Sequence, residues 1–220
     1  ETDGSFIIKG SGENDVIVGD AGADRIEGGA GADRLEGGEG SDTLIGGADD
    51  DTFVYATGTE GTDIIKDFQT GMDKYDTDFN TINRGNFDDW VTLSDGNTAI
   101  SSGEDTPLTG NVRINVSERD VDVLYYSGSL GITATSSLVN ILDALEENLV
   151  EVDHDESSNS FTNGEFSGVD AANFLLVLHD TDGNDTYLLE VQNDDTLLNS
   201  ADVDLVSVFE GVNLATGDII

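Results

Sequence analysis

The chain has 220 residues, of which 47 are acidic and 8 are basic, so its formal net charge is −39. So negative a surface argues strongly against nucleic acid, anionic membranes and phosphate ligands as partners, and it favours cations. There is no cysteine, which excludes a disulfide framework, and no apolar run approaches the length of a transmembrane span. The length suits one elongated domain or two small ones.

Residues 1–5 have neither the basic nor the apolar region of a cleaved secretory signal, and there is no initiator methionine. We therefore interpret the chain as the C-terminal piece of a longer protein. Phe6, Ile7 and Ile8 come next, and this apolar run predicts a short strand that caps the structure formed by the residues after it.

Residues 10–54 repeat one nine-residue unit five times, and each unit begins with glycine. The sixth position is always aspartate and the eighth is always large and apolar, which gives Asp15, Asp24, Asp33, Asp42 and Asp51, and Ile17, Ile26, Leu35, Leu44 and Phe53. Glycine at positions one, two and four permits sharp turns. A short strand with one inward side chain is unstable alone, so the period predicts stacked units that bury the apolar line and also stack the turns.

The pattern G-G-x-G-x-D-x-U-x resembles the calcium-binding repeat of the RTX (repeats-in-toxin) family. In that family two successive units make one coil of a parallel β-roll. The resemblance therefore implies a mainly all-β fold in which each unit lies above the unit two places later. It also implies Ca²⁺ between the turns of units one and three, two and four, and three and five, or roughly three to five ions in all. An all-oxygen cage with flexible geometry favours Ca²⁺ over Mg²⁺.

The same resemblance implies a set of ligands. Carboxylates would come from Asp24, Asp33, Asp42 and Asp51, with Asp15 in the atypical first unit. Main-chain carbonyls would come from Gly19, Ala21, Ala23, Gly28, Ala30, Ala32, Gly37, Glu39 and Ser41, with Gly29, Gly31, Gly38 and Gly40 contributing as well. The first unit departs from the pattern at residues 11–13 and the fifth at Asp49, as expected of the ends of a stacked array.

A flexible linker rich in glycine and aspartate is the alternative, and it describes the chain without metal. Clustered carboxylates repel one another and the apolar line is thin. The free energy of ion binding would then also be the free energy of folding.

Residues 61–80 resemble the segment that follows the repeats in many RTX proteins, of the form D-x-I-x-D-F-x-x-G-x-D-x-I-D. The matching residues are Asp63, Ile65, Asp67, Phe68, Gly71, Asp73 and Asp76, with Tyr75 where the family has isoleucine. Ile64, Ile65 and Phe68 are expected to close the open end of the roll. Asp67, Asp73 and Asp76 could hold a further calcium ion or form a solvated turn, and both readings stay open. We place a first domain, the roll with its capping segment, at residues 1–80.

Residues 81–220 predict a β-rich C-terminal domain with one helix near residues 136–150. Strands are predicted at Trp90–Leu93, Ala99–Ser101, Val112–Val116, Val121–Tyr126, Asn173–His179, Thr186–Val191 and Leu205–Phe209. Residues 180–185 suggest an EF-hand loop, but Asp185 stands where glycine is needed and Val191 where glutamate is needed. A hairpin turn is the preferred interpretation.

Catalytic patterns are absent from the sequence. The two histidines, His154 and His179, form no HExxH pattern, and there is neither a G-x-S-x-G elbow nor a P-loop lysine. We therefore predict no catalytic residues and no enzymatic activity. Residues 211–220 resemble the uncleaved C-terminal export signal of RTX proteins that leave bacteria by type I secretion.

These observations predict a calcium-dependent folding and stabilising module at the C-terminus of a secreted or surface-bound bacterial protein, supporting type I secretion. Its expected partners are calcium ions and the type I secretion machinery, with a cell-surface glycan or protein as a further candidate. Two alternatives stay open. The chain could be the non-catalytic module of a secreted protease, lipase or polysaccharide epimerase, or the ligand-binding end of an adhesin or surface-layer protein, in which Trp90, Tyr125 and Tyr126 would contact the ligand.

Overall fold

The computed structural model describes residues 4–56, 61–77, 90–94, 123–141, 166–167, 173–192, 197–198, 203–215 and 217–220. The chain forms two compact units. The first contains Glu1–Asn86, Asn184–Thr186 and Val206–Ile220, and the second contains Phe87–Gly183 and Tyr187–Leu205. The domain boundary at residue 80 stays a prediction, but residues 206–220 group with the repeats rather than with the second unit.

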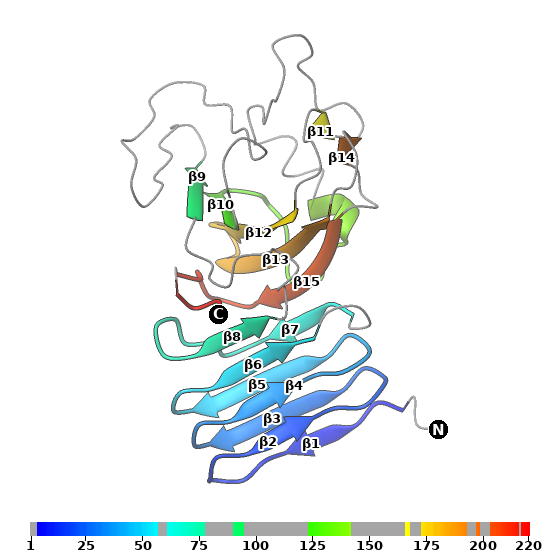
Figure 1. Ribbon diagram of the computed structural model, residues 1–220, viewed down its shortest axis with the longest axis vertical. Helices are drawn as coiled ribbons and strands as arrows, with labels where there is room; N and C mark the ends of the chain where they lie inside the picture. Colours follow the sequence, from blue (N-terminus) through cyan, green and yellow to red (C-terminus); the bar gives the residue numbers. More distant parts are fainter. Residues whose placement is uncertain are drawn as a thin grey trace. The chain divides into compact units, whose positions relative to one another are not determined.

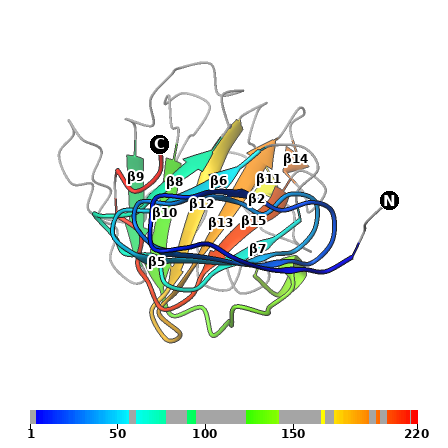
Figure 2. The ribbon, with the colours of Figure 1, turned by 90° about the horizontal axis from the view of Figure 1, so that it is seen from below.

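The first unit is a parallel β-roll of about four turns (Figure 1). One of its sheets contains, in order, β1 (Ile7–Lys9), β3 (Arg25–Ala30), β5 (Thr43–Ala48) and β7 (Asp63–Ile65). The other contains β2 (Val16–Val18), β4 (Arg34–Glu36), β6 (Thr52–Tyr55) and β8 (Lys74–Thr77). Successive strands alternate between the two sheets, so the chain winds in coils that trace a flattened ring when viewed along the stack (Figure 2).

The strand register confirms that two nine-residue units make one coil. Ile26 pairs with Leu44 and Leu35 with Phe53, and in each pair the partners are 18 positions apart. After the repeats the coil lengthens, because Tyr75 pairs with Phe53 across 22 positions. The segment that resembles the family's post-repeat sequence therefore forms one more coil of the same roll.

The apolar residues at the eighth positions form the core of the roll, as the period predicts. Ile26, Leu35 and Phe53 are fully buried and Leu44 is 1% exposed. Ile17 is only half-buried, because its coil has a neighbour on one side alone. The predicted strand at the start of the chain is confirmed as β1, which pairs in parallel with β3.

The other end of the roll is closed by residues from the far end of the sequence. β15 (Val203–Phe209), predicted at Leu205–Phe209, pairs in parallel with β7. Ile219 then forms a parallel bridge with Tyr75 of β8. The aromatic rings at this end contact one another, with the centroids of Phe68 and Phe209 5.3 Å apart and those of Tyr75 and Phe209 5.2 Å apart.

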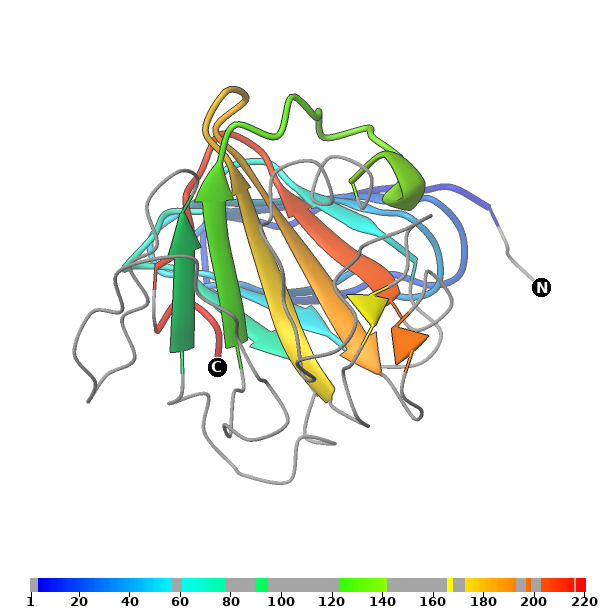
Figure 3. The ribbon, with the colours of Figure 1, turned by 90° about the horizontal axis from the view of Figure 1, so that it is seen from above.

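In the described part of the second unit, four longer strands lie side by side in one sheet (Figure 3). β9 (Trp90–Ser94), β10 (Val123–Gly128) and β12 (Asn173–Asp180) are parallel neighbours, and β13 (Asp185–Gln192) follows β12 in the sheet. All four overlap predicted strands. β11 (Phe166–Ser167) and β14 (Leu197–Leu198) form a small antiparallel pair that was not predicted.

Several predictions for the second half concern residues outside the described part of the chain. These include the strands Ala99–Ser101 and Val112–Val116 and most of the helix near 136–150, of which residues 138–141 are described and helical. Within the described ranges, no helix is long and apolar enough to cross a membrane.

The turn between β12 and β13 is a hairpin turn, as preferred from the sequence. The Asp180 side chain is fully buried and accepts hydrogen bonds from the amides of Leu130 at 2.8 Å and Gly183 at 3.2 Å. Both carboxylate oxygens therefore accept amides that hold the turn in place.

Candidate metal centre

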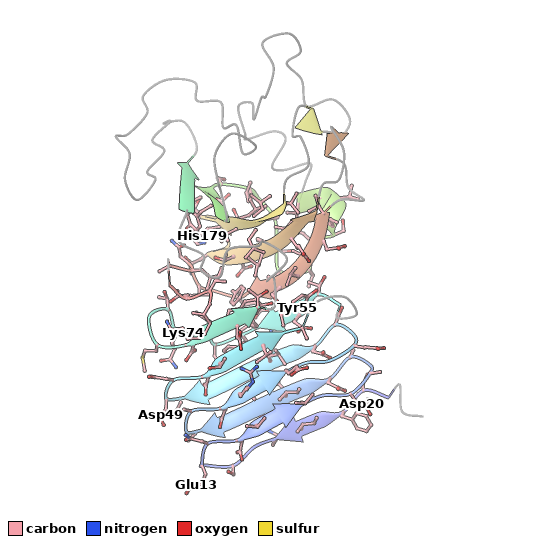
Figure 4. The ribbon with its side chains drawn as sticks, in the orientation of Figure 1. Glu13, Asp20, Asp49, Tyr55, Lys74 and His179 are labelled. Atoms are coloured by element: carbon pink, nitrogen blue, oxygen red, sulfur yellow. The ribbon has the colours of Figure 1, made fainter. Side chains whose placement is uncertain are left out.

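The aspartates at the sixth positions connect each coil to the next. The Oδ1 atom of Asp33 accepts the amide of Asp15 at 2.8 Å, and that of Asp51 accepts the amide of Asp33 at 2.9 Å. Asp73 continues this column by accepting the amide of Asp51 at 3.0 Å. The turns of units one and five, marked by Glu13 and Asp49, lie on one edge of the roll (Figure 4).

A second column of turns lies on the opposite edge, marked by Asp20 of unit two in Figure 4. Here Asp24 Oδ1 accepts the amide of Phe6 at 2.7 Å, and Asp42 Oδ1 accepts the amide of Asp24 at 2.7 Å. Asp63 Oδ1 accepts the amide of Asp42 at 3.0 Å. Asp63 was not among the predicted site residues, although it is the first aspartate of the post-repeat segment and could have been found from that position.

The second carboxylate oxygen, Oδ2, is bonded differently in the inner aspartates and in those near the ends of the roll. The Oδ2 atoms of Asp33, Asp42 and Asp51 are buried and have no hydrogen-bond partner. By contrast, Asp15 Oδ2 accepts the Ser11 amide at 2.6 Å, and Asp73 Oδ2 accepts the Gln69 amide at 2.7 Å. A buried carboxylate oxygen without a partner is costly, so its presence at three equivalent positions indicates a ligand atom for a cation.

Glycine at the first position of each unit makes room for this oxygen. A Cβ atom on Gly28, Gly37 or Gly46 would lie 2.3 Å from the Oδ2 atom of Asp33, Asp42 or Asp51, respectively. No real Cβ atom approaches an oxygen so closely, so any other residue would displace the carboxylate. The sixth-position aspartate and the first-position glycine therefore form one structural element in each turn.

Main-chain carbonyls of neighbouring coils converge on the same turns. A Cβ atom on Gly47 would lie 2.0 Å from the carbonyl oxygen of Gly29, and one on Gly38 would lie 2.4 Å from that of Asp20. Both glycines have positive φ, at 114° and 93°. Asp49 occupies position four of the fifth unit and also has a positive φ, at 77°. Aspartate tolerates this left-handed backbone conformation better than most residues other than glycine.

The electrostatics of the turns favour a bound cation. The pKa of Asp51 is raised to about 6, first by burial and then by the nearby charges of Asp73, Asp33 and Asp67. Burial also raises the pKa of Asp42, with a smaller contribution from Asp24. These carboxylates resist ionisation mainly because they are buried, and a bound cation would offset that cost.

The predicted carbonyl ligands lie in these two columns. The turns 19–24 and 37–42 stack on one edge and the turns 28–33 and 46–51 on the other, as the register of β3, β4, β5 and β6 requires. Some of these carbonyls already accept hydrogen bonds, and that of Glu39 accepts the Gly22 amide at 2.7 Å. A carbonyl oxygen has a second lone pair for a metal. The assignment of individual ligands stays a prediction.

The aspartates after the repeats differ in their surroundings. Asp67 accepts the amides of Gly46 and Gly47, each at 2.9 Å, so it anchors the turn of unit five. Asp76 forms an exposed ion pair with Arg34 at 2.8 Å. A further calcium site at Asp67 and Asp73 stays a prediction.

Within the described ranges, no three acidic or histidine side chains converge into a ready-made metal cluster. Each site would therefore depend on one or two carboxylates together with main-chain carbonyls. All these donors are oxygen atoms on stacked, glycine-rich turns. This donor set fits Ca²⁺, which takes six to eight oxygen ligands in flexible geometry, better than Mg²⁺, which demands a regular octahedron.

The profile of the RTX calcium-binding nonapeptide repeat matches residues 7–35 and 27–59, with four copies. No curated protein matches the chain. Residues 7–59 of the roll therefore consist of RTX repeats, which bind Ca²⁺, and the chain carries a calcium-binding module of the RTX type. This module is not catalytic, and proteins that contain such repeats are typically secreted by bacteria.

Proposed function

We propose that this chain is the calcium-dependent folding and stabilising module of a secreted bacterial protein, and that it supports type I secretion of that protein without catalysing a reaction. The observation that carries the proposal is the set of three buried, unpartnered oxygens on Asp33, Asp42 and Asp51. The thin apolar core of the roll adds support, since β3, β4 and β5 each bury one large apolar side chain, Ile26, Leu35 and Leu44.

Asp33, Asp42 and Asp51 would hold the ions together with carbonyls of the stacked turns. Calcium, when bound, supplies positive charge that neutralises the carboxylates. Without it, the net charge of −39 and the buried carboxylates oppose compaction. The chain would therefore stay extended at the submicromolar free calcium of the cytoplasm and fold at the millimolar calcium outside the cell, since a ligand that binds only the folded state stabilises that state.

Folding outside the cell would also oppose backward movement of the chain through an export channel.

The aromatic candidates for an adhesin function add little to this account. Tyr125 is half-buried, and the side chains of Trp90 and Tyr126 lie outside the described part of the chain.

Far-ultraviolet circular dichroism of the chain in chelator, in Mg²⁺ and in Ca²⁺ tests the folding step. We expect a largely disordered spectrum in chelator and in Mg²⁺ and a strand-rich spectrum in Ca²⁺. A chain that is equally strand-rich in chelator would contradict the proposal. Secretion by a host with a type I system, compared between the natural chain and a variant with Asp33, Asp42 and Asp51 changed to asparagine, tests the export step.

A further inference from the structure

The turn 28–33 of repeat unit three lies on one edge of the roll, between the turns of repeat units one and five. Its successive amides from Ala30 to Asp33 donate alternately to unit one and to unit five. The acceptors are, in chain order, the Ser11 carbonyl at 3.2 Å, the Ala48 carbonyl at 3.1 Å, the Asn14 Oδ1 atom at 3.0 Å and the Asp51 Oδ1 atom at 2.9 Å. This turn is therefore held from both sides before any ion is considered.

Two of the side chains that hold this turn stand at positions where the repeat does not require them. Asn14 Oδ1 accepts the Ala32 amide, and Asp49 Oδ2 accepts the Gly31 amide at 3.2 Å, in addition to the Ala48 carbonyl. Asn14 occupies the variable fifth position of unit one, and Asp49 stands where the pattern has its last glycine. Both belong to end units of the array, and both bond to the unit in its middle.

Asp49 occupies its position at a cost to the backbone. Its φ of 77° lies in the region that glycine adopts most readily, and glycine is the residue that the pattern has there. A non-glycine residue held in this region indicates a role for its side chain. Asp49 is exposed and lies on the edge of the roll that Glu13 also marks (Figure 4), so burial of its side chain is not the reason for its presence.

The corresponding positions on the opposite edge have no side-chain oxygen. Around the turn 37–42 of unit four, the fifth position of the coil before is Ala23. In the coil after, Gly61 precedes Asp63 by two residues, as Asp49 precedes Asp51. Asp63 bonds to the Asp42 amide as Asp51 bonds to the Asp33 amide, so the positions are equivalent. These two side-chain contacts are therefore particular to the edge that carries Asp33.

Fixing an amide also fixes a carbonyl, because the N–H and C=O of one trans peptide group point in opposite directions. The bond from Ala32 to Asn14 sets the direction of the Gly31 carbonyl, and the bond from Gly31 to Asp49 sets that of the Ala30 carbonyl. Both carbonyls are among the predicted calcium ligands. The same turn carries Asp33, whose buried Oδ2 has no hydrogen-bond partner.

We infer that Asn14 and Asp49 are positioning residues for the calcium ion held at Asp33. They keep the turn 28–33 in the shape that presents its oxygens, without themselves contacting the ion. A turn that is already ordered loses less conformational freedom when the ion binds, so calcium binds more tightly. This inference rests on the proposed function, since it concerns the affinity of the same sites.

The substitution Asp49→Gly tests the role of Asp49, because it relaxes the backbone and removes the acceptor at once. If only the backbone mattered, this variant of the 220-residue chain would fold at the same calcium concentration or a lower one. We expect the calcium midpoint, measured by circular dichroism, to rise by roughly two- to fivefold, as for the loss of one hydrogen bond. Asn14→Ala should act in the same direction.

Two further variants separate positioning from charge and from ligation. Asp49→Asn keeps an acceptor oxygen and tolerates positive φ, so it should recover most of the shift. Asp50→Ala is the matched control, because it removes the same charge from the next position and introduces the residue that units two and three have there. It should change the midpoint little. Equal shifts in Asp49→Gly and Asp50→Ala, or in Asp49→Gly and Asp49→Asn, would overturn the positioning role.

A pair of double-mutant cycles tests whether Asp49 acts through the ion at Asp33. Asp49→Gly is combined with Asp33→Asn on its own edge and with Asp42→Asn on the opposite edge. The shift in calcium midpoint caused by Asp49→Gly should disappear beside Asp33→Asn and persist beside Asp42→Asn. Equal shifts in the two backgrounds would show a general effect on the roll and would overturn the inference. A natural chain that does not fold with calcium contradicts the proposed function itself, whereas one that does, with Asp49→Gly unchanged, overturns this inference alone.

Discussion

The amide of Asp33 donates to one carboxylate oxygen of Asp51 at 2.9 Å, while the other oxygen of Asp51 is buried without any partner. One side chain thus fixes the spacing between two coils and leaves a charged atom for a cation. The same division holds for Asp42, whose Oδ1 accepts the Asp24 amide. Coil stacking and ion binding therefore depend on the same residues.

Replacing Asp42 by asparagine should weaken calcium binding while preserving the shape of the turn. The amide side chain can still accept the Asp24 hydrogen bond through its oxygen, but it lacks the charge that a cation requires. We expect the calcium midpoint for folding, measured by circular dichroism, to rise by roughly tenfold or more, as for loss of a charged contact. Glu36→Gln is the control, because it removes one negative charge from the neighbouring unit without removing a sixth-position ligand. It should change the calcium midpoint little. An equal shift of the midpoint in both variants would show a general effect of net charge instead.

Replacing Gly28 by alanine should destabilise the loaded roll. The new Cβ atom would lie 2.3 Å from Asp33 Oδ2 and 2.7 Å from the Gly46 carbonyl oxygen. We expect a loss of about 1–3 kcal/mol in the free energy of unfolding, measured with urea in saturating calcium, as for overpacking elsewhere. Gly12→Ala is the matched control, because a Cβ atom there meets nothing within 4 Å. Similar losses in the two variants would show that the crowding at Gly28 is unimportant.

Shortening Leu35 to alanine should leave a cavity in the single line of core residues. Leu35 is fully buried and pairs with Ile17 and Phe53 in the coils on either side. The free energy of unfolding in calcium should fall by about 2–5 kcal/mol. Val16→Ala, at a strand position 75% exposed, should change it by much less. Full stability of the Leu35 variant would mean that the apolar line contributes little.

Acid should stabilise the calcium-free roll and weaken the calcium-bound one. The pKa of Asp51 is raised to about 6, and those of Asp42 and Asp73 are also raised, in each case first by burial. An acid with a higher pKa in the folded chain than in the unfolded chain opposes folding when it is charged. The calcium-free fold is therefore favoured below pH 4 and loses stability as the pH rises through 6.

Circular dichroism in chelator should accordingly show more strand near pH 4.5 than at pH 7. The calcium midpoint should be higher at pH 5.5 than at pH 7, because protons compete with the ion for the same carboxylates. If the midpoint does not depend on pH in this range, the carboxylates with raised pKa are not ligands.

The sequence predicted the roll well because its period repeats the same physical requirement in every unit. An aspartate and a large apolar residue at fixed positions specify both the stacked turns and the buried line from Ile26 to Phe53. The further aspartate of the second column, Asp63, was missed because it lies outside the five units, in a coil of different length. The return of the end of the chain to the roll was missed for a stronger reason. No repeat marks these residues, and the pairing of β15 with β7 and of Ile219 with Tyr75 depends on contacts between residues far apart in the sequence.

The second unit was predicted less completely. β12 and β13 were found because long runs of apolar and β-branched residues flank a turn of aspartate and glycine. The two-residue strands β11 and β14 have no such pattern, since a pair so short is formed by its surroundings and not by its own sequence.

A crystal structure of the chain grown in abundant calcium tests the central claim most directly. We predict metal density beside the Oδ2 atoms of Asp33, Asp42 and Asp51, with carbonyl oxygens of the adjacent turns completing each coordination shell. Turns without metal density, or density bound only by exposed carboxylates elsewhere, would contradict the account.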